Sequence, residues 1–346
     1  MAYIMQKTID IAVLGATGMT GEAIINILGE RNFPVGKLYA LASKKSVNKT
    51  VLFRNKKINV VDADKFNFST VRLAFFSAGS IASKMYAEKA AATGCIVIDN
   101  TSEFRYDSDI PLIVPEVNPN KIADYSNRNI ISSPNCSTIQ MVVALKPIYD
   151  VAGIIKINVA TYQSVSGSGK NAITSLVSQT RTLLNSYPGK SKIYPNQIAF
   201  NVIPHIDSFL DNGFSKEEMK IVWETQKIFE DTDISINATA VRVPVICGHS
   251  EALQVTTKKP LLAQEARFLL SNAPGVKVFD NLNRSIYPTP ALDAVGIDAV
   301  FVGRVRNEIN NEKCLNLWVV SDNIRKGAAL NSIQIAEILL KKHIGF

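Results

Sequence analysis

The segment that most constrains the fold of this 346-residue chain is TIDIAVLGATGMTGEAIINILGE, residues 8–30. It begins with the β-branched, apolar residues of a buried strand, and residues 19–30 carry apolar side chains at helical spacing. Gly15, Gly18 and Gly21 form a GxxGxxG pattern at the turn between the two. Glycines there let the backbone approach a phosphate group, which the N–H groups of the helix N-terminus can bind. A tight turn without a ligand is the alternative, but the place in the first βα unit favours a dinucleotide-binding loop.

The segments that follow predict a parallel sheet. Helical segments such as 81–94 lie between some of the short apolar strands, which are expected at 37–43, 71–79, 95–100, 112–117 and 129–133. Alternating β and α units of this kind are typical of a doubly wound parallel sheet with helices on both faces.

The pattern changes after about residue 150. Longer segments such as IKINVATYQSVSG and CLNLWVVSDN alternate polar and apolar residues, which predicts a largely antiparallel sheet with one covered face. Helices are expected at 168–186, 215–230, 262–272 and, as a strongly amphipathic segment, 325–344. The predicted fold class is therefore α/β, with an N-terminal doubly wound parallel sheet followed by an α+β domain.

Composition narrows the classes of function. The chain is 47% hydrophobic and 20% charged, and no apolar run reaches the roughly 18 residues of a membrane span, so no membrane association is expected. The formal net charge is +8, but basic residues occur in no run longer than a pair, which favours small anionic ligands over nucleic acid. The four cysteines match no CxxC or zinc spacing, so neither disulfides nor a metal is expected. The first residues do not resemble a signal peptide, which predicts a cytoplasmic protein.

The end of the second strand bears on the choice of dinucleotide. NAD-preferring sites usually place an Asp or Glu there, to bind the ribose hydroxyls. This chain has Ser43, Lys44, Lys45 and Ser46 and no acid. Hydroxyl and cationic side chains suit a 2′-phosphate, so NADP is favoured over NAD, with a solvated basic turn as the alternative.

The segment IISSPNCSTIQ places Cys136 where a strand passes into a helix. A helix N-terminus stabilises a thiolate and makes it a nucleophile, whereas a buried cysteine is often only a small hydrophobe. A nucleophilic thiol needs a proton acceptor, usually a histidine, and the chain offers His205, His249 and His343. His249 lies after a glycine at the entry to a strand, which gives it a modest lead over the other two.

Further polar residues occupy places that suit a site. Gln163 ends a predicted strand before a Ser/Gly loop, and Arg105 follows the strand at 95–100. Glu217 and Lys220 are three residues apart on a predicted helix, and their default interpretation is a surface ion pair. Together these features suggest a cysteine enzyme that uses NADP on an anionic substrate.

The chain resembles the aspartate-β-semialdehyde dehydrogenase family over essentially its whole length. The motifs run in order: GATGMTGEAIINIL, SAGS, DNTSEFR, VPEVN, SSPNCSTIQMVVALKPI, YQSVSGSGKNA, EEMK, RVPVICGHSEA and VSDNIRKGAALN. The resemblance implies a Rossmann-like NADP-binding domain at 1–135, completed by the C-terminal helix at 325–346. It also implies a catalytic and dimerisation domain at 136–324, and a homodimer.

The resemblance implies a role for each matching residue. Cys136 is the nucleophile, His249 the general acid/base, and Gln163 aligns the substrate. The substrate-binding positions are Asn135, Arg242 for the α-carboxylate, Glu217 for the amino group, and Arg105 and Lys220 for phosphate. The NADP(H)-binding positions are Gly15, Thr17, Gly18, Met19, Thr20, Ser43, Lys45, Ser46, Ser77, Gly79, Ser166, Gly167 and Asn323.

The implied reaction is the NADPH-dependent reduction of L-aspartyl-4-phosphate to L-aspartate 4-semialdehyde and phosphate, and its reverse. It belongs to lysine (through diaminopimelate), threonine and methionine biosynthesis. One rival is N-acetyl-γ-glutamyl-phosphate reductase, whose thiol box typically reads Gly-Cys-Tyr-Pro where this chain has NCST. The other is a catalytically silent relative, which would have no need to keep Cys136, Gln163, Arg242 and His249 together.

Overall fold

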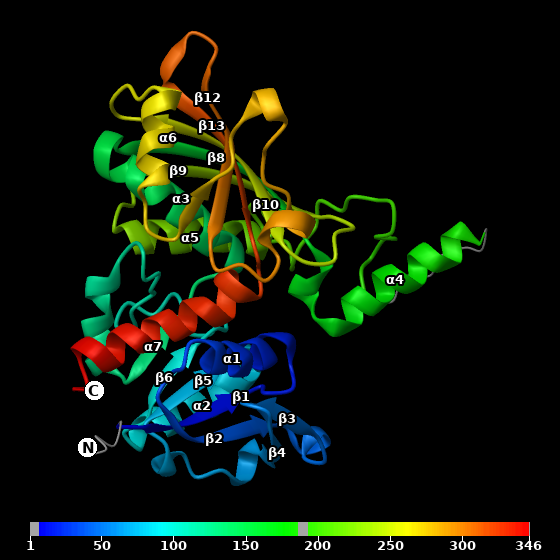
Figure 1. Cartoon of the computed structure of the whole chain (residues 1–346), viewed down its shortest axis with the longest axis vertical. Coiled ribbons are helices and arrows are strands. Elements are labelled where there is room, and N and C mark those ends of the chain that lie inside the picture. Colours follow the sequence, from blue (N-terminus) through cyan, green and yellow to red (C-terminus); the bar gives the residue numbers. More distant parts are fainter. Residues whose placement is uncertain (1–6, 186–192, 346) are drawn as a thin grey trace. The chain divides into compact units, whose positions relative to one another are not determined.

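The computed structural model describes residues 7–185 and 193–345. The first six residues and residue 186, the expected end of one helix, lie outside this range. The chain divides into two compact units, Met1–Pro134 with Ala328–Phe346, and Asn135–Gly327 (Figure 1). No helix in the described ranges is long and apolar enough to cross a membrane.

The first unit is built on a seven-stranded sheet with the order β3-β4-β2-β1-β5-β6-β7. Neighbouring strands are parallel except for β3 and β4. The bounds are β1 Ile9–Leu14, β2 Val35–Ala42, β3 Thr50–Phe53, β4 Lys56–Asp62, β5 Leu73–Phe76, β6 Ile96–Asp99 and β7 Ile130–Ser132.

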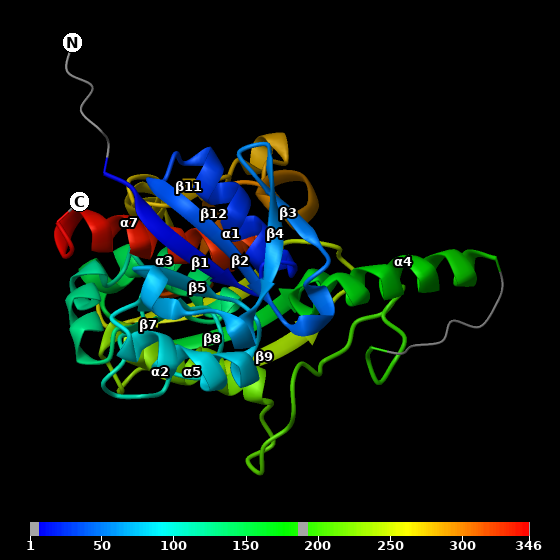
Figure 2. The ribbon, with the colours of Figure 1, turned by 90° about the horizontal axis from the view of Figure 1, so that it is seen from below.

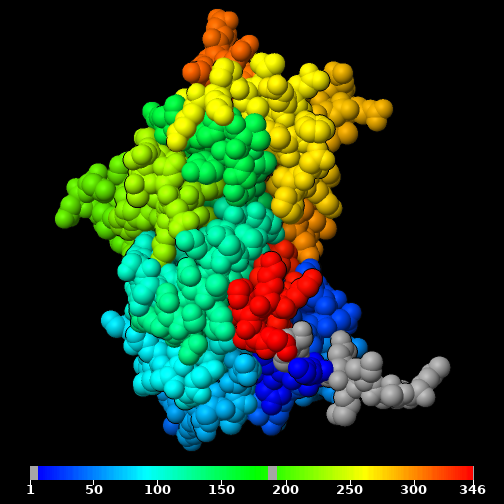
Figure 3. All heavy atoms as spheres, turned by 90° about the vertical axis from the view of Figure 1, so that its left-hand side faces the viewer, coloured from blue at the N-terminus to red at the C-terminus, as the bar shows by residue number. Residues whose placement is uncertain are grey.

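Helices cover both faces of this sheet. α1 (Met19–Glu30) and α7 (Leu330–Lys342) pack with Ile11 and Val13 of β1 on one face. α2 (Ser80–Ala92) packs with Ala12 and Leu14 on the other. Successive residues of a strand point to opposite faces, so an almost wholly apolar β1 needs helices on both sides. The prediction of a doubly wound parallel sheet is therefore confirmed. The exposed surface of α7 is the red patch in Figure 3.

Two local predictions for this unit need correction. Residues 112–117 form no strand, and Leu112 makes only an isolated bridge to Ser132. The β3–β4 hairpin was not expected. Its turn residues, Arg54 and Asn55, both have positive φ angles (48° and 63°), as a tight hairpin requires, but the pair lacks the glycine that usually indicates such a turn.

The second unit contains a six-stranded sheet with the order β11-β12-β13-β10-β8-β9. The central pairings are antiparallel, whereas β11/β12 and β8/β9 at the two edges are parallel. The bounds are β8 Ile154–Gln163, β9 Ser235–Arg242, β10 His249–Thr257, β11 Val276–Val278, β12 Val300–Glu308 and β13 Asn311–Ser321. The sheet is thus mixed, with an antiparallel centre.

Helices of the second unit cover one face of its sheet: α3 (Cys136–Ala152), α5 (Lys216–Phe229) and α6 (Ala263–Ser271). α4 (Lys170–Leu184) projects away from this sheet in both ribbon views (Figures 1 and 2). On the strands, Tyr162 is 37% exposed and its ring lies 5.4 Å from that of Trp318. These rings mark a face that the helices leave open.

Candidate active site

The site in the second unit is built around the first residue of α3. Asn135 is the N-cap of this helix, and its Oδ1 accepts a hydrogen bond of 2.9 Å from the Ser137 N–H. Cys136 follows as the first helical residue, with a half-buried side chain. A thiolate at this place lies at the positive end of the helix dipole.

The other three cysteines have environments that disfavour ionisation. Burial raises the pKa of Cys95 to about 12 and also raises the pKa values of Cys247 and Cys314. None of the four is in a disulfide, and no described group of His, Cys, Asp and Glu has the geometry of a metal site. Cys136 is therefore the thiol whose position suits a nucleophile.

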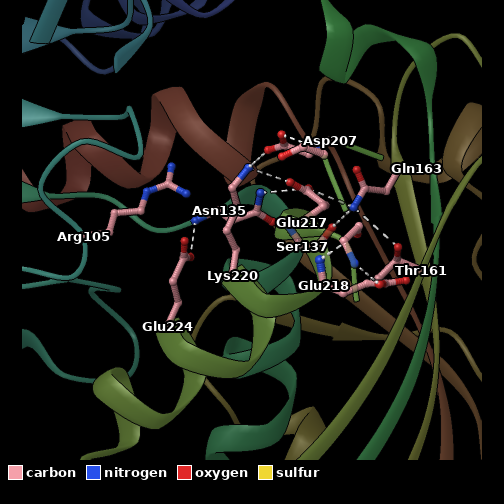
Figure 4. A network of polar contacts seen from close by, with 12 residues as sticks. Arg105, Asn135, Ser137, Thr161, Gln163, Asp207, Glu217, Glu218, Lys220 and Glu224 are labelled. Carbon is pink, nitrogen blue, oxygen red and sulfur yellow. Dashed lines mark hydrogen bonds and ion pairs between the residues drawn. The ribbon is translucent and has the colours of Figure 1, made fainter. Parts of the chain in front are cut away.

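Gln163 ties three elements together beside this helix terminus. It ends β8, and its Nε2 donates to Ser137 Oγ in α3 (3.0 Å) and to Glu217 Oε1 in α5 (3.1 Å) (Figure 4). Asn135 Nδ2 donates to the same Glu217 oxygen at 3.0 Å. The side chain of Gln163 is thereby fixed next to the residue that follows the thiol.

Glu217 is buried and Lys220 is largely buried, so the default interpretation of these two residues as a surface ion pair was wrong. Lys220 Nζ lies 3.0 Å from Glu217 Oε2 and 2.7 Å from Asp207 Oδ2. Burial raises the pKa of Glu217, but the charge of Lys220 and hydrogen bonds from Lys220, Asn135 and Gln163 outweigh it and lower that pKa. Burial likewise lowers the pKa of Lys220, but the two carboxylates raise it overall. The site therefore holds a fixed anion and a fixed cation side by side.

His249 begins β10 and is fully buried. Its Nδ1 accepts from the Ser164 backbone N–H at 3.1 Å, and Ser164 Oγ lies at the same distance. Because a backbone N–H can only donate, the neutral ring carries its proton on Nε2, which has no hydrogen-bond partner among the described residues. Burial, and next the charge of Arg242, lower the pKa of His249 to about 3.

Arg242 ends β9 and lies near His249. Its Nη1 donates to the Ser164 carbonyl at 2.8 Å, and its Nε is buried without a hydrogen-bond partner in the described part of the chain. A Cβ atom on Gly167 would lie 3.1 Å from Arg242 Nη1 and 3.4 Å from His249 Nε2, so glycine keeps space open in front of both groups. The other histidines lie elsewhere, since His205 stacks on Phe209 in a loop and His343 contacts Tyr125 in the first unit.

Asn323 organises the loop after β8. Its Oδ1 accepts from Ser166 Oγ (3.0 Å), Ser164 Oγ (3.2 Å) and the Gly248 N–H (2.9 Å). Its Nδ2 is buried and has no hydrogen-bond partner within residues 7–185 and 193–345. A buried donor without an acceptor is costly, so this atom fits a polar ligand group such as a carboxamide oxygen.

The glycine loop of the first unit has the geometry of a phosphate-binding turn. Gly15 has a φ angle of +87°, and a Cβ atom on Gly21 would lie 2.2 Å from the Gly15 carbonyl oxygen. Gly18 is the N-cap of α1 and offers no side-chain acceptor, while Met19 and Thr20 begin the helix and Thr17 precedes it. The loop follows the carboxyl end of β1, where open parallel sheets bind ligands.

Other predicted cofactor residues follow neighbouring strands of the same sheet. Ser43, Lys45 and Ser46 come after β2 in a short 3₁₀ turn, with Ser43 and Lys45 exposed. Ser77 follows β5 and donates to the Leu14 carbonyl at 3.0 Å, while Gly79 has a φ angle of +87° and open space beside it. All of these lie at the carboxyl ends of parallel strands.

Arg105 belongs to the first unit. It is 5% exposed, and its Nη2 donates to the Asn100 carbonyl at 2.8 Å, in the segment that follows β6. It too comes after a parallel strand, as expected.

Sequence reasoning missed several site residues: Ser164, Asp207, Glu224 and Gly327. Gly327 lies against the thiol, because a Cβ atom there would be 2.8 Å from Cys136 Cβ. Glu224 could have been predicted from its spacing, since it lies seven residues after Glu217 and therefore on the same face of α5. Asp207 comes from a distant loop and Gly327 from the short π-helical turn Arg325–Ala329, and no periodicity indicates either of them.

Two family models match the chain in order. They are described as the "Semialdehyde dehydrogenase, NAD binding domain", over residues 10–125, and the "Semialdehyde dehydrogenase, dimerisation domain", over residues 145–326. The fold and the thiol site thus define a semialdehyde dehydrogenase, an oxidoreductase acting on an aldehyde group.

Individual relatives narrow the class. An aspartate-semialdehyde dehydrogenase of Legionella pneumophila is 59% identical over 98% of both chains, and one of Bacillus subtilis is 44% identical over 98% of this chain and 100% of its own. The crystal structure of aspartate semialdehyde dehydrogenase II from Vibrio cholerae complexed with ASA has a TM-score of 0.96 at 53% identity, covering 98% of this chain and 100% of that one. This chain belongs to the aspartate-semialdehyde dehydrogenase family.

Proposed function

We propose that this chain catalyses the NADPH-dependent reductive dephosphorylation of L-aspartyl-4-phosphate to L-aspartate 4-semialdehyde and phosphate, and the reverse reaction, through a thioester on Cys136. One observation carries the proposal. A cysteine at a helix N-terminus lies in the same unit as a buried neutral histidine, a buried arginine and a buried Glu–Lys pair. The Vibrio cholerae relative, solved with ASA, supports the choice of substrate.

The charges of the site match those of the substrate. Arg242, whose Nε has no hydrogen-bond partner among the residues that the structure describes, would bind the α-carboxylate. Glu217 would bind the amino group together with Asn135. Lys220 and Arg105 would bind phosphate. A short molecule held at both ends has its reacting carbon in one place, which raises the effective concentration of the thiol by orders of magnitude.

In the first step, the Cys136 thiolate forms a bond to the acyl carbon. The bond from that carbon to the phosphate oxygen breaks, and phosphate leaves with the electron pair. N–H groups in the first turn of α3 face the negative oxygen that develops, and each such donor is worth about 3 kcal/mol in similar sites. Gln163, held by Ser137 and Glu217, keeps the substrate aligned with the sulfur.

NADPH, when bound, supplies the hydride that reduces the thioester. The residues that would hold it are the glycine loop at 15–21, Ser43, Lys45, Ser46, Ser77 and Gly79 in the first unit, and Ser166, Gly167 and Asn323 in the second. Two features fit this cofactor. The buried Nδ2 of Asn323 has no hydrogen-bond partner among the described residues, and the tight packing of Gly21 against the Gly15 carbonyl leaves no room for a side chain. Lys45 and Ser46 favour the 2′-phosphate of NADP.

His249 acts as the general acid/base that transfers a proton to and from the oxygen on the reacting carbon. Its Nε2–H is the donor that can serve the negative oxygen on the reduced carbon, and the proton returns to Nε2 as the aldehyde departs and the Cys136 thiolate re-forms. The Arg242 charge contributes to the low pKa of the ring. A bound carboxylate would offset that charge and raise the pKa, so substrate binding itself prepares His249 for proton transfer.

We also propose that the first unit is the NADP-binding domain, and that the second is the catalytic and dimerisation domain of a homodimer. The open sheet face around Tyr162 and Trp318, together with Ala252, which pairs with Trp318, offers a surface that a second copy would cover. The description of the matching family model supports this. The cytoplasm, which supplies NADPH and the phosphorylated amino acid, is the proposed location.

The test is a spectrophotometric assay with aspartate semialdehyde, phosphate and either NADP or NAD. We expect reduction of NADP that depends on phosphate, together with a covalent adduct on the Cys136 peptide in mass spectra of enzyme quenched during turnover. N-acetyl-γ-glutamyl semialdehyde is the matched control substrate, and a preference for it would overturn the proposal. The NCST box and the names of the relatives do not favour that alternative.

A further inference from the structure

Two carboxylates of α5 hold the residue before the thiol. Asn135 Nδ2 donates to Glu217 Oε1 at 3.0 Å, and the Asn135 backbone N–H donates to Glu224 Oε2 at 2.6 Å. Glu217 and Glu224 are seven residues apart, two turns along one face of α5 (Figure 4). Together with its capping bond to Ser137, Asn135 is thus held through its backbone and both ends of its side-chain amide.

Glu217 already has a role in binding the substrate, but Glu224 has none. Glu224 is fully buried, and one of its contacts is a short hydrogen bond in which the Asn135 backbone N–H donates to its carboxylate. Bonds to an ionised acceptor are about twice as strong as those between neutral groups. The peptide unit that Glu224 holds joins Pro134 to Asn135, the residue immediately before Cys136.

We propose that Glu224 is a positioning residue, which holds the Asn135–Cys136 turn so that the sulfur and the first-turn N–H groups of α3 meet the acyl carbon together. The inference rests on the proposed role of Cys136. Glu224 acts through the backbone and touches no substrate. Its negative charge lies one residue from the thiol and opposes ionisation of the sulfur, so the benefit of this residue is geometric.

Glu218 provides a matched control on the same helix. It is also buried, and its carboxylate also accepts backbone N–H groups, from Ser215 (2.6 Å) and Ala240 (2.9 Å). Those contacts cap α5 and join it to β9, away from the Asn135–Cys136 turn. Loss of Glu218 therefore reports the cost of removing a buried carboxylate without disturbing that turn.

The experiment compares Glu224→Ala, Glu224→Gln and Glu218→Ala in the full-length protein. Thermal unfolding, kcat, KM for aspartate semialdehyde and the pH profile of Cys136 alkylation by iodoacetamide are measured, with the alkylated peptide identified by mass spectrometry. For Glu224→Ala we expect kcat to fall roughly 10- to 100-fold with KM within about threefold, as a misplacement near 1 Å can cause. Glu218→Ala should lose a similar amount of thermal stability yet keep the alkylation profile and kcat.

Glu224→Gln keeps an oxygen acceptor and removes the charge. We expect it to restore kcat to within about fivefold of wild type and to move the alkylation midpoint to lower pH. This variant decides the matter if Glu224→Ala fails to fold, because an unmoved midpoint, or a kcat more than about fivefold below wild type, would overturn the proposal. Equal thiol profiles in Glu224→Ala and Glu218→Ala would also overturn it.

The same assay separates this inference from the proposed function. If complete alkylation of Cys136 in the wild-type protein leaves turnover intact, the nucleophile assignment itself fails. If alkylation abolishes turnover but the Glu224 variants match wild type, only the positioning role fails.

Discussion

The candidate sites of the two units are built from different kinds of groups. In the first unit the candidate site consists of backbone turns and exposed side chains, such as the Gly15–Gly21 loop and Lys45, at the ends of parallel strands. In the second unit it consists of buried side chains that fix one another, such as Gln163, Glu217 and His249. A backbone site suits a common cofactor, whereas a network of buried charges suits chemistry that depends on protonation state.

The first prediction separates chemistry from cofactor binding. Cys136→Ala should lower kcat by at least about 10⁴, as removal of a nucleophile does in other covalent enzymes. NADPH affinity, measured by fluorescence titration, should stay within about twofold because most of the predicted cofactor residues belong to the first unit. Turnover of the variant near the wild-type rate would show that Cys136 is not the nucleophile and that the second unit does not carry out the chemistry through this thiol.

The second prediction concerns His249. His249→Gln should lower kcat by roughly 10²–10⁴, as for other acid/base residues. The folded pKa of about 3 lies below the usual value of 6.5, so between these values the unfolded chain binds the proton more readily. Stability should therefore fall with decreasing pH in this window, by up to about 1.4 kcal/mol per pH unit. Urea unfolding at pH 7 and pH 5 should show a weaker acid dependence in the variant, and an equal dependence would contradict the assigned environment.

The third prediction tests the backbone site. Gly21→Ala would place a Cβ atom 2.2 Å from the Gly15 carbonyl oxygen. We expect a loss of about 1–3 kcal/mol in stability and a weaker affinity for NADPH, because the loop must move. Gly29→Ala is the control, since Gly29 lies on the same helix α1 but a Cβ atom there would come no closer than 3.8 Å to another residue, at Arg54 Cγ. If both variants bind NADPH equally well, the close contact does not shape the site.

The fourth prediction returns to the buried network. Glu251 lies two residues after His249 and is fully buried, and its hydrogen bond with the Gln140 side chain is too weak to offset that burial. Burial raises its pKa well above the usual value, so the folded state keeps a proton that the unfolded chain releases. Stability from this group is complete below about pH 4.5 and falls as pH rises toward the folded pKa. Glu251→Gln, neutral at every pH, should raise stability at pH 8 by about 1–2 kcal/mol and change it little at pH 4.5.

The smallest expected effect lies at the exposed edge of the first unit. Lys45→Ala should raise the Kd for NADPH about fivefold, in keeping with one exposed charge, and leave the Kd for NADH unchanged. Lys89→Ala, on the outer side of α2, is the control for net charge. An equal change for both cofactors would show that Lys45 does not contact the 2′-phosphate.

Local sequence patterns predicted the structure correctly wherever it depends on residues that are close together in the chain. The first βα unit, the N-cap at Asn135 and the strand end at Gln163 follow from residues within a few positions of one another. Prediction failed where distant packing decides. Residues 112–117 are apolar enough for a strand but form only an isolated bridge at Leu112 followed by a turn. The Glu217–Lys220 pair, by default a surface ion pair, is largely buried beside Asp207.

The sequence by itself determined the α/β architecture, the phosphate-type glycine loop and the cysteine at a helix start, because spacing and conformational preference act over short distances. Only the tertiary structure decided which partners those residues have. Ser164 meets His249 across 85 residues, and Asn135 meets Glu224 across 89. Such contacts set the protonation states of the site residues and hold the Asn135–Cys136 turn in place. They form only once the strands and helices that carry these residues have packed together.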